Sequence, residues 1–324
     1  MSRPALLRRD AIGARVAPST LLSSIAGRIV SDARYPNRDY RLTRRQFTAG
    51  LASVFLPAVA TASTETRRLA VLDWGWAESL LALDYKPFAV AEAPLYGDRV
   101  VTPALSTDTI DLGLRSWPNV ELLRALKPEL IVSQAGYGIS AERLGAIAPT
   151  LALPLYGPAR QPLLAAEHAL KEIARRIGRE ERATDYLELS YARLNAIAHN
   201  AKDYDGRALL IIKFTDDRLI DIYGAGGLFD DVLKRIGIAN AWDGKTNNWG
   251  FATAGLEAIA RYPEARLVII EPGPPGLFLQ SALWNALPAV RNGRVAMIPP
   301  TWVFGAFPSA MRFAEVLRQS LGIA

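Results

Sequence analysis

Short apolar segments alternate with helix-forming segments along most of the chain after residue 68, and this alternation limits the folds open to it. In the first half, runs of strand length lie at 69–74, 88–93, 109–112, 130–134 and 150–155. Strands that alternate with helices are typical of βα units, which build a mostly parallel sheet. The same pattern resumes after Gly206. We therefore expect an α/β protein with two lobes.

A long helical segment separates the two alternating regions. Residues 162–202 consist largely of helix formers. Leu187, Tyr191 and Leu194 recur at intervals of three and four, which predicts one face of a helix of about six turns beginning near Glu180. Such a helix is a stiff connection, unlike a Gly/Ser-rich linker. We expect a single long rigid helix to join the lobes and to leave a ligand cleft between them.

The N-terminal region has the pattern of an export signal. Thr-Arg-Arg-Gln-Phe at 43–47 precedes the uncharged, Ala-rich stretch 48–62, which ends in Ala-Thr-Ala. A positive segment, a short apolar segment and a small-x-small end predict a signal peptide, and the paired Arg resembles the twin-arginine type. We expect export to the periplasm and cleavage near Ala62; the alternative is a basic arm with an amphipathic helix. The predicted parts are the leader 1–62, the N-terminal lobe 63–160, the helical linker 161–204 and the C-terminal lobe 205–324.

Charge and composition exclude several functions. The chain has 38 Lys and Arg against 32 Asp and Glu, but residues 1–62 hold ten Arg and three Asp. The remainder therefore has 28 basic and 29 acidic residues and no excess positive charge for nucleic acid. The absence of Cys excludes disulfides, thiolate nucleophiles and iron–sulfur ligation. With His168 and His199 as the only imidazoles, a His-rich metal site is also unexpected.

Aromatic and polar residues follow several of the predicted strands. In open α/β sheets, ligands bind beyond the carboxyl ends of the strands. Five of the seven Trp fall at such positions or in cleft loops, beside Arg, Tyr, Gly or Asn. Aromatic walls with a few polar anchors are typical of small-molecule pockets. For any one Trp, packing against the core of its own lobe is an equal alternative, but the repetition in both lobes favours a pocket.

Catalytic patterns are missing from the sequence. It contains neither a Gly-x-Ser-x-Gly elbow nor a phosphate-binding loop, and no His follows a predicted strand. Gly-Ala-Gly-Gly at 224–227 does not match the dinucleotide-binding pattern and is interpreted as a tight turn into a helix. We therefore expect a binding protein rather than an enzyme, with no cofactor and no protein-held metal.

Several blocks together resemble the periplasmic iron(III)-hydroxamate binding proteins. They are Asp-Leu-Gly-Leu-Arg at 111–115, Ala-Gly-Tyr-Gly at 135–138, Asn-x-Trp-Gly at 247–250, Leu-Trp-x-Ala-Leu-Pro at 283–288 and Trp-x-Phe-Gly-Ala at 302–306. The resemblance covers essentially the whole chain after the leader. It implies two βα lobes joined by a long helix, and a monomer that captures a ferric siderophore for an inner-membrane ABC permease with its ATPase.

The resemblance also implies roles for individual residues. Arg115 matches the Arg that donates to hydroxamate oxygens, and Tyr137 matches the Tyr that shares them. The matching cleft aromatics are Trp249, Trp302 and Phe304, with Trp74 as a weaker candidate. Because the siderophore already surrounds its iron with oxygens, the protein needs no metal ligands. A guanidinium fork can donate to two hydroxamate oxygens at once.

Two positions depart from the family pattern, and two more are candidates for docking. Phe304 stands where relatives tend to have Tyr, and Arg99 stands where a relative has a cleft Trp; a second cation would admit a more anionic cargo. Glu142 and Glu257 match the carboxylates that dock to permease arginines, although first-turn acids are also favoured by the helix dipole. The rival interpretations are a catecholate siderophore, haem or corrinoid as cargo, or an exported α/β enzyme.

Overall fold

The first of two five-stranded sheets is entirely parallel. The computed structural model describes residues 67–324. Its N-terminal sheet has the strand order β3-β2-β1-β4-β5. The strands are β1 (Leu69–Val71), β2 (Ala89–Val90), β3 (Ile110–Asp111), β4 (Leu130–Gln134) and β5 (Thr150–Leu153). The connecting helices are α1 (Trp74–Ala82), α2 (Ala93–Arg99), α3 (Val120–Leu126) and α4 (Ala141–Gly145). This order confirms the βα interpretation of the first lobe.

The C-terminal sheet is mixed, with the strand order β10-β9-β6-β7-β8. Strands β6 (Leu209–Phe214), β9 (Arg266–Ile270) and β10 (Val295–Ile298) run parallel. Strands β7 (Leu219–Tyr223) and β8 (Phe251–Gly255) are antiparallel additions at one side. The segments around them are α7 (Leu228–Ile236), the 3-10 helix η2 (Leu256–Arg261), α8 (Gly276–Leu279), α9 (Ala282–Ala286) and α10 (Pro288–Arg291).

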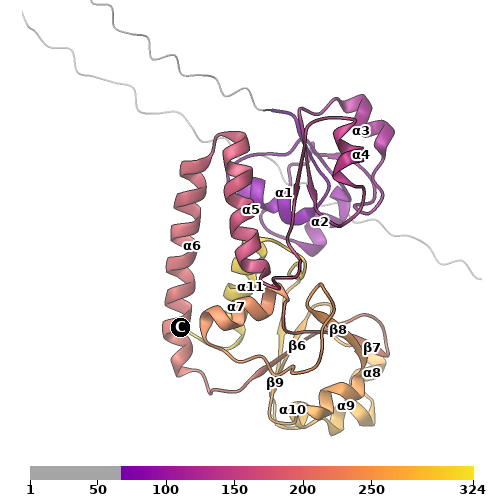
Figure 1. Ribbon diagram of the computed structural model, residues 1–324. Coiled ribbons are helices and arrows are strands. Elements are labelled where there is room, and N and C mark those ends of the chain that lie inside the picture. Colours follow the sequence, from indigo (N-terminus) through magenta and orange to yellow (C-terminus); the bar gives the residue numbers. More distant parts are fainter. Residues whose placement is uncertain (1–66) are drawn as a thin grey trace, which may run out of the picture. The chain divides into compact units, whose positions relative to one another are not determined.

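Long helices connect the two lobes. Helix α5 (Pro162–Ile177) is followed by α6 (Glu180–Asn200) and the short 3-10 turn η1 (Ala201–Asp203). In Figure 1, α6 runs from the level of the N-terminal lobe to that of the C-terminal lobe. The predicted long helix beginning near Glu180 is confirmed. The closing helix α11 (Phe307–Ser320) packs against α1, α5, α6 and α7, so it also links the lobes.

A shared core lies between the inner faces of the two sheets. Leu69 and Val71 of β1 belong to the same buried cluster as Leu209 and Ile211 of β6, together with side chains of α1, α5, α6, α7 and α11. The alternate residues of the two strands, Ala70 in β1 and Leu210 in β6, enter separate outer cores. This alternation is the period-two pattern of a strand covered on both faces. The described residues form one compact unit.

Two local features of the structure differ from the sequence prediction. The run 69–74 is a strand only to Val71, because the Asp73 side chain accepts a hydrogen bond from the Gly75 N–H and starts α1 at Trp74. Strand β8 was not predicted, since Phe-Ala-Thr-Ala-Gly has little apolar content. The leader with its signal and cleavage site lies outside the described residues. Within the described part of the chain, no helix has the length and apolar character to span a membrane.

Candidate functional site

A cavity of about 270 Å³ lies between loops of the two lobes. It is lined by Asp73, Arg115, Gln134, Tyr137, Trp249, Phe251, Trp302 and Phe304. The N-terminal residues come from the carboxyl ends of β1, β3 and β4, and Trp302 and Phe304 follow the carboxyl end of β10. The cavity therefore lies beyond the carboxyl ends of the strands, where ligands bind in open α/β sheets.

Arg115 is held on several sides within this cavity. Its Nε donates to Glu92 Oε2 at 2.8 Å, and its Nη1 lies 3.7 Å from Asp73 Oδ2. The guanidinium carbon lies 4.0 Å from the ring centroid of Trp74 and 4.8 Å from that of Trp302. Among residues 67–324, neither terminal nitrogen makes a hydrogen bond. Arg115 is thus oriented through Nε and can donate to a ligand through its two terminal amino groups.

Different backbone features position Asp73 and Glu92 next to Arg115. Asp73 caps α1 and is 3% exposed. Burial raises the pKa of Asp73 to about 6, against the lowering effect of Arg115. Glu92 has a left-handed backbone with φ 51°, and its N–H donates to the carbonyl of Gly113 at 2.7 Å. That bond ties the start of α2 to the loop that carries Arg115.

Aromatic rings form a continuous wall across the two lobes. Trp249 contacts Tyr137, Tyr156 and Phe304, with ring centroids 5.8, 5.1 and 5.6 Å apart. Phe304 in turn lies 5.5 Å from Trp302. Edge-to-face and tilted pairs of this kind are favourable arrangements for aromatic rings. The wall gives the cavity an apolar surface opposite a small number of polar groups.

Glycines allow the loops to approach one another. Gly138 has φ +67°, and a Cβ there would lie 3.0 Å from the carbonyl oxygen of Arg115. This close approach places Tyr137 beside Arg115. In the other lobe, Asn247 Oδ1 accepts from the N–H of Trp249 at 2.9 Å and of Phe251 at 3.3 Å. That turn orients Trp249 and leads directly into β8.

The structure brings together five of the seven residues expected to bind ligand. Arg115, Tyr137, Trp249, Trp302 and Phe304 line the cavity. The expectation that Trp74 lines it is wrong in placement. Trp74 is 2% exposed and lies beneath Arg115, with its Nε1 donating to the carbonyl of Ala91.

Arg99 lies apart from these residues. It lines an adjacent cavity of about 280 Å³, which shares Trp302 and also contains Lys213, Asp98 and Glu271. Burial and the charge of Arg99 lower the pKa of Lys213. The expected second cation is therefore accompanied by carboxylates in its own cavity.

Three lining residues were not predicted from the sequence, namely Asp73, Gln134 and Phe251. Asp73 and Gln134 lie at the carboxyl ends of β1 and β4, and this position could have identified them as candidate lining residues. Phe251 belongs to the unpredicted strand β8. The supporting residue Glu92 was also missed, because no sequence pattern marks its left-handed backbone.

The two candidate docking acids are exposed first-turn residues. Glu142 lies in the first turn of α4, whose Ser140 cap accepts from the Arg143 N–H. Glu257 lies in the first turn of η2. Within residues 67–324 neither makes an ion pair. Their carboxylates stand on different lobes.

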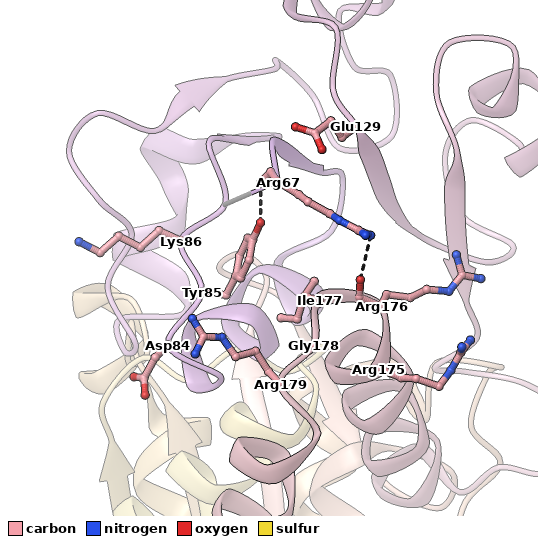
Figure 2. A pocket seen from close by; sticks show the side chains of 10 residues that line it. All are labelled: Arg67, Asp84, Tyr85, Lys86, Glu129, Arg175, Arg176, Ile177, Gly178 and Arg179. Atoms are coloured by element: carbon pink, nitrogen blue, oxygen red, sulfur yellow. Dashed lines mark hydrogen bonds between the residues drawn. The ribbon is translucent and has the colours of Figure 1, made fainter. Parts of the chain in front are cut away.

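A larger cavity of about 700 Å³ lies at the amino end of β1, by the turn between α5 and α6. Figure 2 shows Arg67 there, donating to the carbonyl of Arg176 and accepting from the Tyr85 hydroxyl at its own carbonyl. Arg175 and Arg176 are both paired with Glu172. Much of the basic lining of this cavity is therefore already paired, and the cavity has no aromatic wall among the described residues.

No group of three or more His, Cys, Asp or Glu among the described residues could hold a metal ion.

Comparison with known proteins defines the class to which this fold and cavity belong. Residues 69–301 match the periplasmic binding protein family, and the chain belongs to that family. It is 33% identical over 285 residues to the iron(3+)-hydroxamate-binding protein FhuD of Escherichia coli (strain K12), covering 86% of this chain and 96% of that protein. The resemblance seen in the sequence is thereby confirmed.

Solved structures agree with this assignment. The siderophore-binding protein FhuD from Vibrio cholerae, solved with Fe3+–Desferal bound, matches with a TM-score of 0.74 and 28% identity. The match covers 79% of this chain and 98% of that one. FhuD2 from Staphylococcus aureus with bound ferrioxamine B matches with a TM-score of 0.63 and 18% identity, over 79% of this chain and 98% of that one. At this identity the match shows the fold alone.

Proposed function

We propose that this protein captures a ferric hydroxamate siderophore in the cavity between its lobes and delivers it to an ABC permease. The observation that carries this proposal is Arg115, whose Nε donates to Glu92 while neither terminal nitrogen makes a hydrogen bond within residues 67–324. A ferric hydroxamate needs hydrogen-bond donors for its oxygens rather than protein ligands for its iron. The guanidinium supplies two donors in a fixed fork, and the rings of Trp249, Trp302 and Phe304 cover the apolar backbone of the chelate.

Fluorescence titration of residues 63–324 tests the cargo. Ferrichrome and ferrioxamine B should quench tryptophan fluorescence saturably, whereas a ferric tris-catecholate should not. Arg115→Lys keeps the charge but loses the fork, and we expect affinity to fall by about 10- to 100-fold, as for loss of one charged hydrogen bond. Arg124→Lys on α3 is the matched control and should bind normally. Quenching by the catecholate alone, or full affinity in Arg115→Lys, would overturn the proposed cargo or its anchor.

Delivery would use the two exposed carboxylates. We propose that Glu142 on the N-terminal lobe and Glu257 on the C-terminal lobe dock to basic residues of the permease, which works with its ATPase. Reversal of both charges to Lys should abolish uptake of radiolabelled ferric siderophore while leaving binding in solution unchanged. Reversal of Glu188 on α6 and Asp217 in the β6–β7 turn is the control. Normal uptake by the Glu142→Lys, Glu257→Lys variant would contradict the docking role.

The leader supports the proposed location. We propose that the twin-arginine-type segment 43–62 directs the folded chain to the periplasm, where it acts as a monomer. Replacing Arg44 and Arg45 together by Lys should retain the protein in the cytoplasmic fraction, whereas Arg41→Lys should not. Periplasmic recovery of the double variant would contradict this export route. Light scattering of the cleaved protein tests the monomer.

A further inference from the structure

Arg160 joins two loops of the C-terminal lobe. It lies in the segment that leads from β5 to α5. Its Nη1 donates to the carbonyl of Asn247 at 3.2 Å, and its Nη2 donates to the carbonyl of Ala225 and to the Thr246 hydroxyl. The Thr246 hydroxyl in turn donates to the Ala225 carbonyl at 2.6 Å. The guanidinium therefore connects the turn before α7 with the loop before β8.

Two backbone features allow this contact. Arg160 has a left-handed backbone with φ 52°, which is uncommon for residues other than Gly, Asn and Asp. Gly226 has φ +80°, and a Cβ there would lie 2.6 Å from Cζ of Arg160. The Gly-Ala-Gly-Gly turn at 224–227 is thus the surface against which the guanidinium packs. A strained residue on one side of the contact and a glycine on the other indicate that the contact has a role.

The contact continues into the wall of the ligand cavity. The Asn247 carbonyl that accepts from Arg160 also accepts from the Gly250 N–H at 3.1 Å. The Asn247 side chain accepts from the N–H groups of Trp249 and Phe251, which both line the cavity. Arg160 is outside that lining. It therefore holds the backbone turn of two lining residues from behind.

The segment before α5 also contacts the Trp249 ring directly. The Tyr156 ring centroid lies 5.1 Å from that of Trp249, and the Tyr156 hydroxyl donates to the carbonyl of Val303 at 3.3 Å. Trp249 is thus contacted at its ring by Tyr156 and at its backbone turn through Arg160. A ring contact alone leaves an indole free to slide against its neighbour, whereas hydrogen bonds to the backbone fix the point from which the side chain projects.

We propose that Arg160 is a positioning residue for ligand binding, which sets the place of the Trp249 ring by holding the turn 247–251. This inference rests on the proposed function, because it concerns the wall that would cover the chelate. Dispersion attraction falls by a quarter to a half when a contact opens by about 0.5–1 Å, so a small shift of the ring weakens binding. A planar guanidinium suits the role, because its donors are fixed relative to one another.

Arg160→Met keeps an unbranched side chain and removes all three hydrogen bonds. Calorimetric titration with ferrichrome and with ferrioxamine B should show affinity lowered by about tenfold. In a Trp249→Ala background the same substitution should change affinity by less than about twofold, because the ring that Arg160 positions is absent. Arg193→Met on α6 is the matched control; it loses two hydrogen bonds to Glu315 and should bind normally.

Gly226→Ala disturbs the same contact without changing Arg160. The added Cβ displaces the guanidinium, so this variant should reproduce the loss of affinity seen in Arg160→Met. Gly237→Ala is its control, because Gly237 has φ +76° and no atom within 4 Å of an added Cβ. It therefore carries similar backbone strain and should bind normally. Urea unfolding of each variant confirms that the titrated protein is folded.

The 19F resonances of 5-fluorotryptophan report the rings without any ligand. The Trp249 resonance, assigned by its loss in Trp249→Phe, should shift or broaden in Arg160→Met, whereas that of Trp76, which is 0% exposed, should not. An unchanged Trp249 resonance, or an equal loss of affinity with and without the Trp249 ring, would overturn the inference and leave the proposed function intact. Wild-type protein that binds neither chelate would overturn the proposed function, and the 19F spectra would still decide whether Arg160 positions Trp249.

Discussion

Glu78 is a buried carboxylate that ties α1 to the end of the loop after β10, which lines the cavity between the lobes. It is 0% exposed. Its Oε1 accepts from the backbone N–H of Ala306 at 2.7 Å and of Ser309 at 3.2 Å, and its Oε2 accepts from the Ser309 hydroxyl at 2.6 Å. Burial raises the pKa of Glu78 to about 8, although these hydrogen bonds lower it. Glu78 should therefore be largely protonated in the folded protein at pH 7.

The raised pKa predicts how stability depends on pH. A group whose folded-state pKa lies above its unfolded value binds protons more tightly when folded. Its contribution to the free energy of unfolding is fully present below about pH 4.5 and is lost as pH rises through 8. A shift from 4.5 to about 8 corresponds to a loss of order 5 kcal/mol over that window. Glu78→Gln keeps an acceptor for both N–H groups and cannot ionise, so it should avoid this loss.

Urea unfolding at pH 5, 7 and 9, followed by tryptophan fluorescence, measures the effect. The difference in free energy of unfolding between Glu78→Gln and wild type should move in favour of the variant by several kcal/mol from pH 5 to pH 9. Because every other titrating group is common to both proteins, this difference isolates Glu78. Glu78→Ala removes the hydrogen bonds as well and should be destabilised at pH 5. A Glu78→Gln variant that is less stable than wild type by the same amount at every pH would show an ionised carboxylate on the α11 N-terminus and refute the reasoning.

Two further predictions concern backbone and surface charge. Gly250→Ala would place a Cβ 2.1 Å from Gly227 Cα, so it should destabilise the protein by at least ~2 kcal/mol more than Gly237→Ala, which has a similar positive φ but open space. Equal urea midpoints would contradict this. The hydrogen bond from Arg318 lowers the pKa of Glu315 to about 2, so Glu315 contributes stability above its unfolded pKa and loses it as pH falls. Glu315→Gln should melt below wild type at pH 7, and this gap should narrow from pH 5 to pH 3; a constant gap would refute it.

Periodicity predicted the parts of the fold that depend on local pattern. The parallel order of the first sheet follows from βα alternation, and α6 follows from apolar spacing around Leu187. The pairing of β7 with β8 is a tertiary result, because 251–255 acquires strand geometry from register with 219–223 rather than from its own composition. The small residues of this strand give too weak an apolar pattern for a strand to be predicted there.

The sequence predicted the site residues that lie at strand ends and line the cavity. It did not predict which residues are buried behind the lining. Arg115 and Tyr137 were placed by motif and strand-end position, and the structure puts both in one cavity. Trp74 occupies an equivalent sequence position, yet its ring is covered by the guanidinium of Arg115 and by Trp302. Glu92 reaches Arg115 through a backbone conformation that no pattern of side chains reveals. Sequence position therefore identified the wall of the cavity but not the layer behind it.

The layer behind the cavity connects the two lobes. Trp74 of the N-terminal lobe lies with its ring centroid 4.7 Å from that of Trp302, and the Tyr156 hydroxyl donates to the carbonyl of Val303 at 3.3 Å. Glu78 holds the end of the same loop at Ala306. The loop that supplies Trp302 to the cavity is thus fixed to the lobe that supplies Arg115. Contacts within the protein therefore hold both Arg115 and the ring of Trp302 that faces it, and such preorganisation lowers the free-energy cost of ordering a binding site.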